Sequence, residues 1–210
     1  MEALTKLSCE EFLEKLASGN PTPGGGGGAA VAGALAAALS SMVANITVGK
    51  EKFAEQEQEV QELLQSAETL RQRLLKLVDA DAAVFDSFMA CYKLPKNTDE
   101  EKQARTQAIR NAAKQAAEVP FSAAQACLEV LRVAVRIVEI GNPNVITDGT
   151  ISALLARAAM RSEFYNVRIN LGLTKDDSYN SELLAKLDAM EKEALALENK
   201  ALQTTDVAID

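Results

Sequence analysis

The sequence predicts an all-α protein, a helical bundle with one very long helix, and three observations support this class. Aromatic residues make up 4% of the 210 residues and tryptophan is absent, whereas alanine and leucine are abundant, which favours helix packing over strand pairing. Apolar residues recur at helical spacing along most of the chain. Neither glycine nor proline interrupts residues 50–94. With 48% hydrophobic residues and no low-complexity linker, residues 1–210 are expected to form a single domain.

The first two predicted helices flank a glycine-rich segment. Ser8 and Glu11 have the spacing of a capping box, so a helix is expected from Ser8 to about Ser18. Residues 21–28 read Pro-Thr-Pro followed by five glycines, and we expect a loop there because glycine is a poor residue for a helix interior. The stretch from Ala29 to Val48 predicts a central helix, since its small side chains let neighbouring helices approach closely.

Residues 50–94 predict a helix of roughly 60 Å, at about 1.5 Å per residue. Two positions of a seven-residue repeat form a stripe along it, one holding Val60, Ala67, Leu74, Asp81 and Phe88, the other Leu63, Leu70, Leu77, Val84 and Cys91. Asp81 is the only charged residue in this stripe. So long a stripe is expected to pack against a helix that comes partly from a second subunit, which predicts a homodimer.

Further helices are predicted after residue 95. Thr98 and Glu101 form a second capping box, which opens a helix reaching about residue 118. Pro120 lies in a pattern that continues to Ile140, which indicates either one kinked helix or two abutting helices. The last two helices are expected over residues 150–171, capped by Asp148, and 181–202, capped by Ser178 or Asn180, with residues 204–210 frayed.

The content of charged residues, histidine and cysteine argues against several classes of function. The net charge of −8 argues against a broad nucleic-acid or anionic-membrane surface, because both need clustered positive charge. Histidine is absent, so histidine-based triads and imidazole metal ligands are excluded and acid-base chemistry must rely on carboxylates. Cys9, Cys91 and Cys127 lack metal-ligand spacing and suit a reducing cytoplasm. We expect a cytoplasmic protein without a metal site.

The uncharged stretch from Ala29 to Val48 is long enough to span a bilayer. It is mostly alanine and includes polar residues, so it is far weaker than a leucine-rich span. We interpret it as a core helix and expect no membrane association.

Asp81 is the strongest candidate for chemistry. Burying an unpaired carboxylate on an apolar stripe costs several kcal/mol unless the group is neutralised, paired or hydrogen-bonded. Burial also raises the pKa of a carboxyl group toward neutrality, which suits proton transfer. The alternative is a polar residue that sets the register of packed helices. Asp79 faces another side of the helix and is expected to be solvated.

Several other residues are candidates for ligand binding. The glycines at 24–28 can offer backbone N–H groups to an anion at the start of the next helix, or serve as a flexible connector. Asn166 and Asn170 share a helix face, where their amides can bind a polar heterocycle or another helix. Lys50 can simply complement the end of the preceding helix. Two basic strips are either ligand patches or ion-paired surfaces, namely Arg132 with Arg136, and Arg157 with Arg161 and Arg168.

Taken together, these motifs resemble the cyclodeaminase/cyclohydrolase family of tetrahydrofolate enzymes. The similarity covers about residues 5 to 175 in order, which makes it more specific than any single motif. It is carried by Pro21-Thr22-Pro23-Gly24-Gly25-Gly26, Met42-Val43, Gly49-Lys50, Asp79-Ala80-Asp81 with Phe85, Val119-Pro120, Gly141-Asn142, Asp148, and Asn166-Val167 to Asn170.

The resemblance implies an all-helical, cytoplasmic homodimer whose substrate is a folate, with or without a polyglutamate tail. One activity of the family hydrolyses 5,10-methenyltetrahydrofolate to 10-formyltetrahydrofolate. The other closes formiminotetrahydrofolate to the methenyl compound and releases ammonia. Neither reaction needs a metal or a redox cofactor. The absence of a transferase domain tilts the expectation to the cyclohydrolase, and a non-enzymatic helical scaffold is the alternative from another class.

The resemblance also assigns roles to residues. Asp81 corresponds to the catalytic proton donor and acceptor. The expected substrate-binding residues are Pro23, Gly24, Gly25, Gly26, Lys50, Asn142, Asp148, Asn166 and Asn170. Family members commonly have a serine where this chain has Gly27 or Gly28, so a hydroxyl contact is lost there, and the roles of Asn144 and Thr147 stay open. We expect the folate to lie between the glycine segment, the long helix and residues 142–148.

Overall fold

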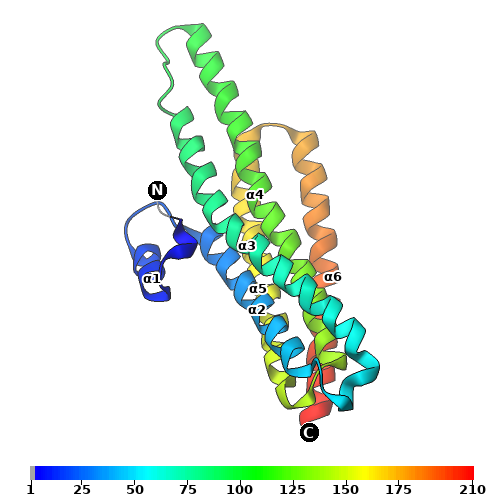
Figure 1. Ribbon diagram of the computed structural model, residues 1–210. Coiled ribbons are helices and arrows are strands. Elements are labelled where there is room, and N and C mark those ends of the chain that lie inside the picture. The colour runs from blue at the N-terminus through cyan, green and yellow to red at the C-terminus, as the bar shows by residue number, and fades with distance from the viewer. Residues whose placement is uncertain (1–2) are drawn as a thin grey trace.

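The computed structural model describes residues 3–210 and consists, over that range, of helices and their connections without a strand (Figure 1). The predicted all-α class is therefore confirmed. The α-helices are α1 (Cys9–Ala17), α2 (Gly25–Thr47), α3 (Glu57–Cys91), α4 (Asp99–Ile140), α5 (Ile146–Thr174) and α6 (Asp177–Ile209). Three short 3-10 helices complete the order, η1 (Leu4–Lys6), η2 (Glu51–Gln56) and η3 (Pro143–Val145).

The helix that packs against all four of the other long helices is α4, and this corrects the predicted central position of α2. Helix α2 packs against α3, α4 and α5, and its alanines at 34, 36, 37 and 44 lie in the main core. It is long and apolar enough to cross a membrane by length and composition, but 56% of its most apolar window is buried within the protein. The alanines of α2 therefore allow close packing against its neighbouring helices.

The predicted extent of α2 was wrong at its start. The glycines expected to form a loop begin the helix instead, since α2 starts at Gly25 with Gly24 as its N-cap. Glycine loses conformational entropy in a helix. The packing at this point, described below, leaves no space for a larger residue at Gly26.

The predicted helix over residues 50–94 is also shorter than expected. Residues 51–56 form η2, and Phe53 has non-helical angles of φ −116° and ψ 21°, so the long helix begins at Glu57. Its buried residues are Val60, Ala67, Leu70, Leu74 and Val78. The neighbouring helices α2 and α4 of the same chain pack against α3. Between Val60 and Val78, the helices that cover the apolar side of α3 thus come from the same chain.

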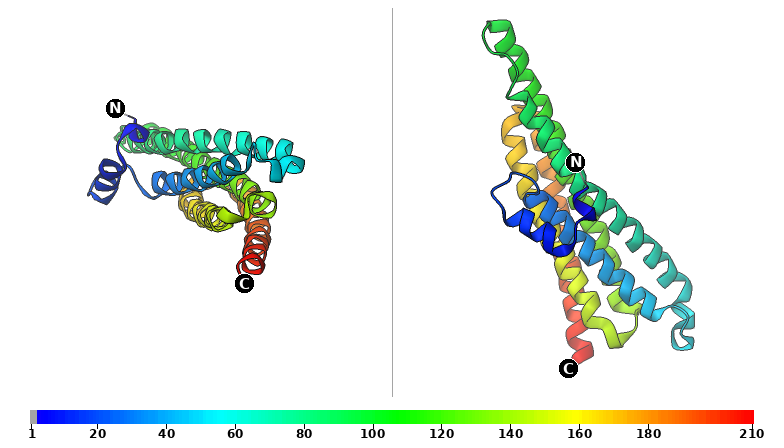
Figure 2. Two further views of the ribbon diagram at one scale, coloured as in Figure 1. Left: turned by 60° about the horizontal axis from the view of Figure 1, so that its bottom comes forward. Right: turned by 60° about the vertical axis from the view of Figure 1, so that its left-hand side comes forward.

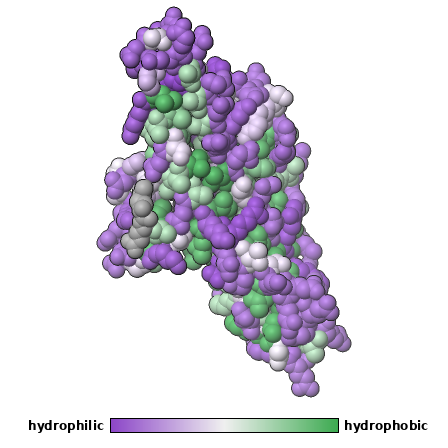
Figure 3. Space-filling model, turned by 45° about the horizontal axis from the view of Figure 1, so that its top comes forward, coloured by the Kyte–Doolittle hydropathy of each residue, from purple (hydrophilic) through white to green (hydrophobic). Residues whose placement is uncertain are grey.

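Helices α3 and α4 form a hairpin whose closed end projects beyond the other helices (Figure 1). Helix α4 is the longest element at 42 residues and runs without interruption through Pro120, so the alternative of two abutting helices is wrong. The projecting end of the hairpin is largely hydrophilic (Figure 3).

Both predicted capping boxes are present, at Ser8 with Glu11 and at Thr98 with Glu101. The N-caps predicted for the last two helices were wrong. Helix α5 begins at Ile146, which places Asp148 within its first turn. Asp176 caps α6, and that helix continues to Ile209 where fraying was expected.

The N-terminal segment lies beside the start of α2 (Figure 2) and is attached to α3 through Asp79. The carboxylate of Asp79 accepts hydrogen bonds from the backbone N–H of Leu4 at 2.7 Å and from the hydroxyl of Thr5 at 3.0 Å. The expectation that Asp79 is merely solvated was wrong, because the segment before α1 supplies donors for it.

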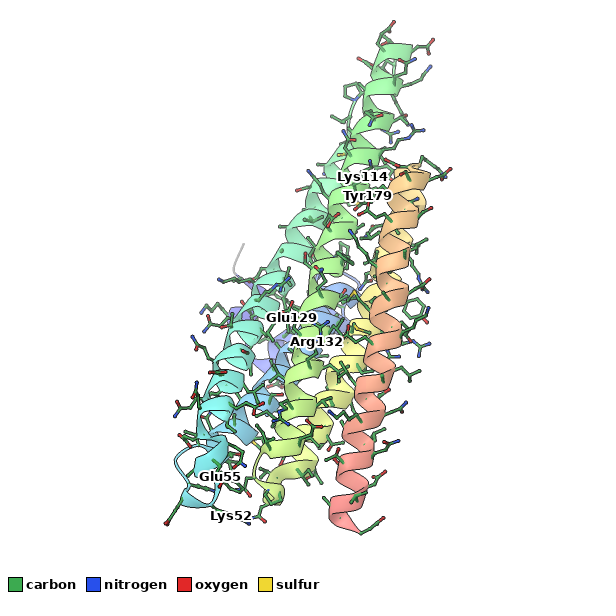
Figure 4. The ribbon with its side chains drawn as sticks, turned by 90° about the vertical axis from the view of Figure 1, so that its right-hand side faces the viewer. Lys52, Glu55, Lys114, Glu129, Arg132 and Tyr179 are labelled. Carbon is green, nitrogen blue, oxygen red and sulfur yellow. The ribbon has the colours of Figure 1, made fainter. Side chains whose placement is uncertain are left out.

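Four of the five arginines in the two basic strips are ion-paired, with Arg168 3.9 Å from Asp188, whereas Arg161 is exposed and has no ion pair among residues 3–210. Arg132 binds Glu193, Arg136 binds Glu59 and Glu139, and Arg157 binds Glu191. Arg132 and Glu129 lie in the second half of α4 (Figure 4). These pairs tie α3 and α6 to α4, and α6 to α5, so Arg132, Arg136 and Arg157 stabilise the packing between helices.

Candidate active site

Asp81 lies against the glycine start of α2, and the backbone of α2 shapes its surroundings. The backbone N–H of Gly27 donates a hydrogen bond to Asp81 Oδ2 at 3.1 Å. A Cβ atom on Gly26 would lie 2.6 Å from Asp81 Oδ1, which is closer than such atoms approach. Glycine at position 26 is therefore required for the carboxylate to reach the helix end. The partial positive charge of that end favours the ionised form of Asp81.

A pocket of about 360 Å³ opens beside this carboxylate. Residues from four helices and the segment before α2 line it: Pro21, Thr22, Gly24, Gly25, Gly26, Asp81, Val84, Phe85, Phe88, Ala116, Asn166, Ile169, Asn170 and Leu173. Its polar groups are the Asp81 carboxylate, two asparagine amides, Thr22 and the backbone at the start of α2, and much of the remaining wall is apolar. A few convergent polar groups in an apolar pocket are typical of small-molecule sites.

The two asparagines use their amide nitrogens within the protein. Asn166 Nδ2 donates to Glu163 Oε2 at 3.0 Å, and Asn170 Nδ2 donates to the carbonyl oxygens of Ala116 at 2.8 Å and Asn166 at 2.9 Å. Their Oδ1 atoms accept no hydrogen bond from residues 3–210. Each asparagine can therefore accept a hydrogen bond from a ligand.

Pro120 explains why Asn170 can bind to α4. In a regular helix the N–H of residue 120 would donate to the carbonyl of Ala116, but proline has no N–H. The freed Ala116 carbonyl accepts from Asn170 Nδ2 instead. The proline in the middle of α4 thus helps to orient an amide that lines the pocket.

A second carboxyl group lies behind Asp81. Glu163 on α5 is 1% exposed, and its burial and the negative charge of Asp81 raise its pKa to about 8, against the lowering effect of the Asn166 hydrogen bond. Burial also raises the pKa of Asp81, while the Gly27 N–H lowers it. The site thus contains two coupled carboxyl groups.

The sequence interpretation missed Glu163, although a signal for it was present. Ala156, Met160, Glu163 and Val167 follow one another at helical spacing, and all four are buried. Glu163 is therefore a carboxylate at an apolar position of a helix, which is the same signal that singled out Asp81 on α3.

The predicted binding residues fall into two groups. Gly24, Gly25, Gly26, Asn166 and Asn170 line the pocket with Asp81, and the buried Pro23 immediately precedes these glycines.

Lys50, Asn142 and Asp148 lie at the other end of α2 from the pocket. The backbone N–H of Asn142 donates to Thr47 Oγ1 in the last turn of α2, and the exposed Lys50 follows that turn. The 23 residues of α2 separate the two ends by about 35 Å, at 1.5 Å per residue. In Figure 4, Lys52 marks this end, while Lys114 and Tyr179 lie toward the opposite one. Within one chain, Lys50, Asn142 and Asp148 therefore lie far from the pocket. This corrects the expectation of a cleft closed by residues 142–148.

The sequence of the chain matches a family of known proteins. The model of the formiminotransferase-cyclodeaminase family matches residues 8–189. The chain is 44% identical to the methenyltetrahydrofolate cyclohydrolase of Methylorubrum extorquens, with 93% of this chain and 94% of that protein covered. It is 30% identical to the formimidoyltransferase-cyclodeaminase of Rattus norvegicus, with 92% of this chain but only 36% of the rat protein covered.

A solved structure agrees with these matches in fold. The crystal structure of formiminotetrahydrofolate cyclodeaminase from Thermotoga maritima superimposes with a TM-score of 0.88 at 29% identity and covers 98% of both chains. The family match spans most of the chain, including all four helices that line the pocket. The chain belongs to the formiminotransferase-cyclodeaminase family.

Proposed function

We propose that this enzyme of folate one-carbon metabolism hydrolyses 5,10-methenyltetrahydrofolate to 10-formyltetrahydrofolate. The choice of reaction rests on the methenyltetrahydrofolate cyclohydrolase that is 44% identical over almost the whole of both chains. The observation that carries the proposal is the half-buried carboxylate of Asp81, which is held by a helix N-terminus at the polar side of a mostly apolar pocket.

The substrate matches the pocket in charge and in polarity. The methenyl bridge carries a positive charge shared by its two nitrogens, which the negative charge of Asp81 attracts. The flat rings suit the apolar wall formed by Val84, Phe85 and Phe88. The Oδ1 atoms of Asn166 and Asn170 accept hydrogen bonds from N–H groups of the pterin.

Asp81 then acts as general base and general acid. A water molecule attacks the methenyl carbon, and the carboxylate takes one proton from it, which forms a neutral tetrahedral adduct. Asp81 returns that proton to the nitrogen whose bond to the carbon breaks, and the second proton of the water is released as the formyl C=O forms. The residue can serve both steps because burial raises its pKa from the ordinary aspartate range. The proposed reaction involves no metal or cofactor.

A second candidate is formiminotetrahydrofolate cyclodeaminase. The solved structure with that activity covers 98% of this chain at 29% identity, so the same site geometry is compatible with either reaction. In the cyclodeaminase, Asp81 would protonate the departing ammonia. Supplying each substrate separately, while methenyl absorbance and ammonia release are followed, distinguishes the two activities.

The variant Asp81→Asn tests the role of the carboxylate. It keeps the shape of the side chain but removes the group that accepts a proton, so we expect turnover to fall at least about a hundredfold while folate binding is kept. Stopped-flow turnover and a folate-binding titration are the measurements. Wild-type turnover in this variant would remove Asp81 from the mechanism. Turnover of neither substrate by the wild-type protein, together with no folate binding, would favour a helical scaffold.

We also propose that the protein works as a cytoplasmic homodimer, without nucleic-acid or membrane partners. The support for a dimer is an apolar surface on α2 and α5, two helices that pack together. Its exposed members are Leu35, Met42, Ile151, Leu154, Tyr165 and Ile169. We name these six residues the α2–α5 surface.

A dimer through the α2–α5 surface gives the distant residues a role in binding. Leu35 lies near the middle of α2, so a two-fold axis passing there would place the partner's α2 antiparallel to the first. The residue Lys50 at the end of one α2 would then approach the glycine start of the other. In that arrangement Lys50, Asn142 and Asp148 would bind the outer part of the folate, with Lys50 attracting its glutamate tail, whether single or extended.

A further inference from the structure

Glu163 is buried in a way that its hydrogen bonds alone do not explain. The side chain is 1% exposed, and its hydrogen-bond partner among residues 3–210 is a single neutral amide, that of Asn166 at 3.0 Å. Among residues 3–210, Glu163 has no ion pair. An ionised carboxylate in such a place is unfavourable, because burial removes water and nothing positive replaces it.

The titratable groups near Glu163 on other helices are Asp81 on α3 and Cys127 on α4. Helix α3 contributes Asp81, whose negative charge opposes ionisation of Glu163. Helix α4 contributes the buried thiol of Cys127, whose own pKa is raised by burial and by Glu163. The glycine start of helix α2 binds Asp81 instead of Glu163, through the backbone N–H of Gly27.

These surroundings decide which carboxyl group carries the charge. Asp81 receives a backbone N–H at the positive end of a helix, lies beside the pocket and is partly exposed to solvent. Glu163 is more deeply buried, and burial raises its pKa to about 8. Two adjacent carboxyl groups of this kind ionise in two steps that belong to the pair. The first negative charge resides on Asp81, and the second forms only at alkaline pH.

On the basis of the proposed function, we propose that Glu163 is a positioning residue that holds the proton of this carboxyl pair. The single negative charge of the pair then stays on Asp81, where it meets the substrate. Loss of the proton from Glu163 places a second negative charge behind Asp81. Asp81 would then hold more tightly the proton that it must hand to the leaving nitrogen, and turnover would slow.

The pH profile of Glu163→Gln tests this role. Glutamine keeps an oxygen that accepts from Asn166 but cannot ionise. In the wild type, with the pKa of Glu163 at about 8, kcat at pH 9 should fall about tenfold below its maximum, because about one molecule in ten keeps the proton. In Glu163→Gln this alkaline decrease should be less than twofold. Rates are measured from pH 6 to 9 with saturating methenyltetrahydrofolate, and the uncatalysed hydrolysis is subtracted at each pH.

Two further variants make the result specific. Asp86→Asn removes an exposed carboxylate of the same helix as Asp81 and should keep the wild-type alkaline decrease. Glu163→Met, which is apolar and of similar size, should lose the decrease as the glutamine variant does. Persistence of the decrease in both Glu163 variants would overturn the inference.

A stability measurement separates this inference from the proposed reaction. At pH 9 the increase in Tm caused by Glu163→Gln should be smaller when Asp81 is already asparagine, because the repulsion between the two carboxylates has then been removed. Wild-type protein that is inactive on both folates contradicts the proposed function, yet this double-mutant cycle still reports the coupling. Equal Tm increases in the two backgrounds would refute the coupling even in an active enzyme.

Discussion

At the scale of single residues, the contact between Gly26 and Asp81 links the fold to the chemistry. A methyl group on residue 26 would lie 2.6 Å from Asp81 Oδ1, so either the carboxylate or the start of α2 must move. We predict that Gly26→Ala lowers kcat at least about tenfold, which corresponds to about 1.4 kcal/mol in the barrier. Steady-state kinetics with methenyltetrahydrofolate measures the effect.

Gly172→Ala is the matched control for this change. Gly172 also lies in a helix, but a Cβ atom there meets nothing within 4 Å. Alanine at that site should keep kcat and raise the free energy of unfolding by up to about 1 kcal/mol, because glycine is the poorer helix former. Equal kinetics for the two variants would show that the close contact at Gly26 is not needed.

Glu163 makes the stability of the fold depend on pH. Its pKa is raised from 4.5 to about 8 in the folded protein, so the folded state keeps a proton that the unfolded state has lost over this range. The contribution of Glu163 to the free energy of unfolding is fully present below about pH 4.5. It is lost as pH rises toward 8, by at most about 1.4 kcal/mol per pH unit. The sign is that of an acid held neutral by burial.

Glu163→Gln should remove this dependence. We predict that its free energy of unfolding, relative to wild type, increases by roughly 3 kcal/mol between pH 5 and pH 8. Urea denaturation at the two pH values measures it, and the exposed Asp86→Asn variant should show no such increase. A constant difference between variant and wild type at both pH values would mean that Glu163 ionises normally in the folded protein.

At the scale of helices, Pro120 in α4 controls an amide on α5. We predict that Pro120→Ala weakens the hold on Asn170, because the restored N–H competes for the Ala116 carbonyl that now accepts from Asn170. If the weaker hold on Asn170 costs about 1 kcal/mol of substrate-binding free energy, KM increases about fivefold. The measurement is KM for methenyltetrahydrofolate, with kcat recorded alongside.

Two comparisons identify the cause of a change in KM. Pro95→Ala alters an exposed proline in the α3–α4 connection and should leave KM unchanged. In an Asn170→Ala background, Pro120→Ala should have no further effect, since the amide it acts on is gone. An additive effect in that background would assign the change to α4 itself.

The helices also show what the sequence could and could not predict. The two capping boxes and the all-helical class follow from local patterns, and both are present. The glycine start of α2 was predicted as a loop, because local propensity does not include the carboxylate of Asp81 that demands a close approach from another helix. The seven-residue repeat predicted which side of α3 is buried only between Val60 and Val78, where neighbouring helices of the same chain cover it.

The candidate site shows the same limit. Asp81 was found because a carboxylate interrupts an apolar stripe, and Glu163 carries that signal on α5. The resemblance to a family named Asn166 and Asn170 as binding residues, and both line one pocket with Asp81. It could not show that Lys50 and Asn142 lie at the far end of α2, because order along the chain does not fix distance in a bundle of long helices.

At the scale of the whole molecule, the α2–α5 surface distinguishes a dimer from a monomer. Leu35 is 56% exposed and Met42 is 37% exposed, and both lie on the exposed side of α2. Contiguous exposed apolar residues of this kind mark interaction surfaces. We predict that the double variant Leu35→Glu and Met42→Glu shifts the protein from dimer to monomer in analytical ultracentrifugation, because a two-fold interface would bring four added negative charges together.

Leu195→Glu is the matched control, because this residue is also 50% exposed but lies on α6, away from the α2–α5 surface. It should leave the sedimentation coefficient unchanged. If the partner supplies Lys50 to the pocket, the monomeric double variant should also raise KM, and Lys50→Ala should raise KM in the dimer without dissociating it. A monomeric variant with unchanged KM would show that each chain binds its substrate alone, and a monomeric wild type would exclude the dimer altogether.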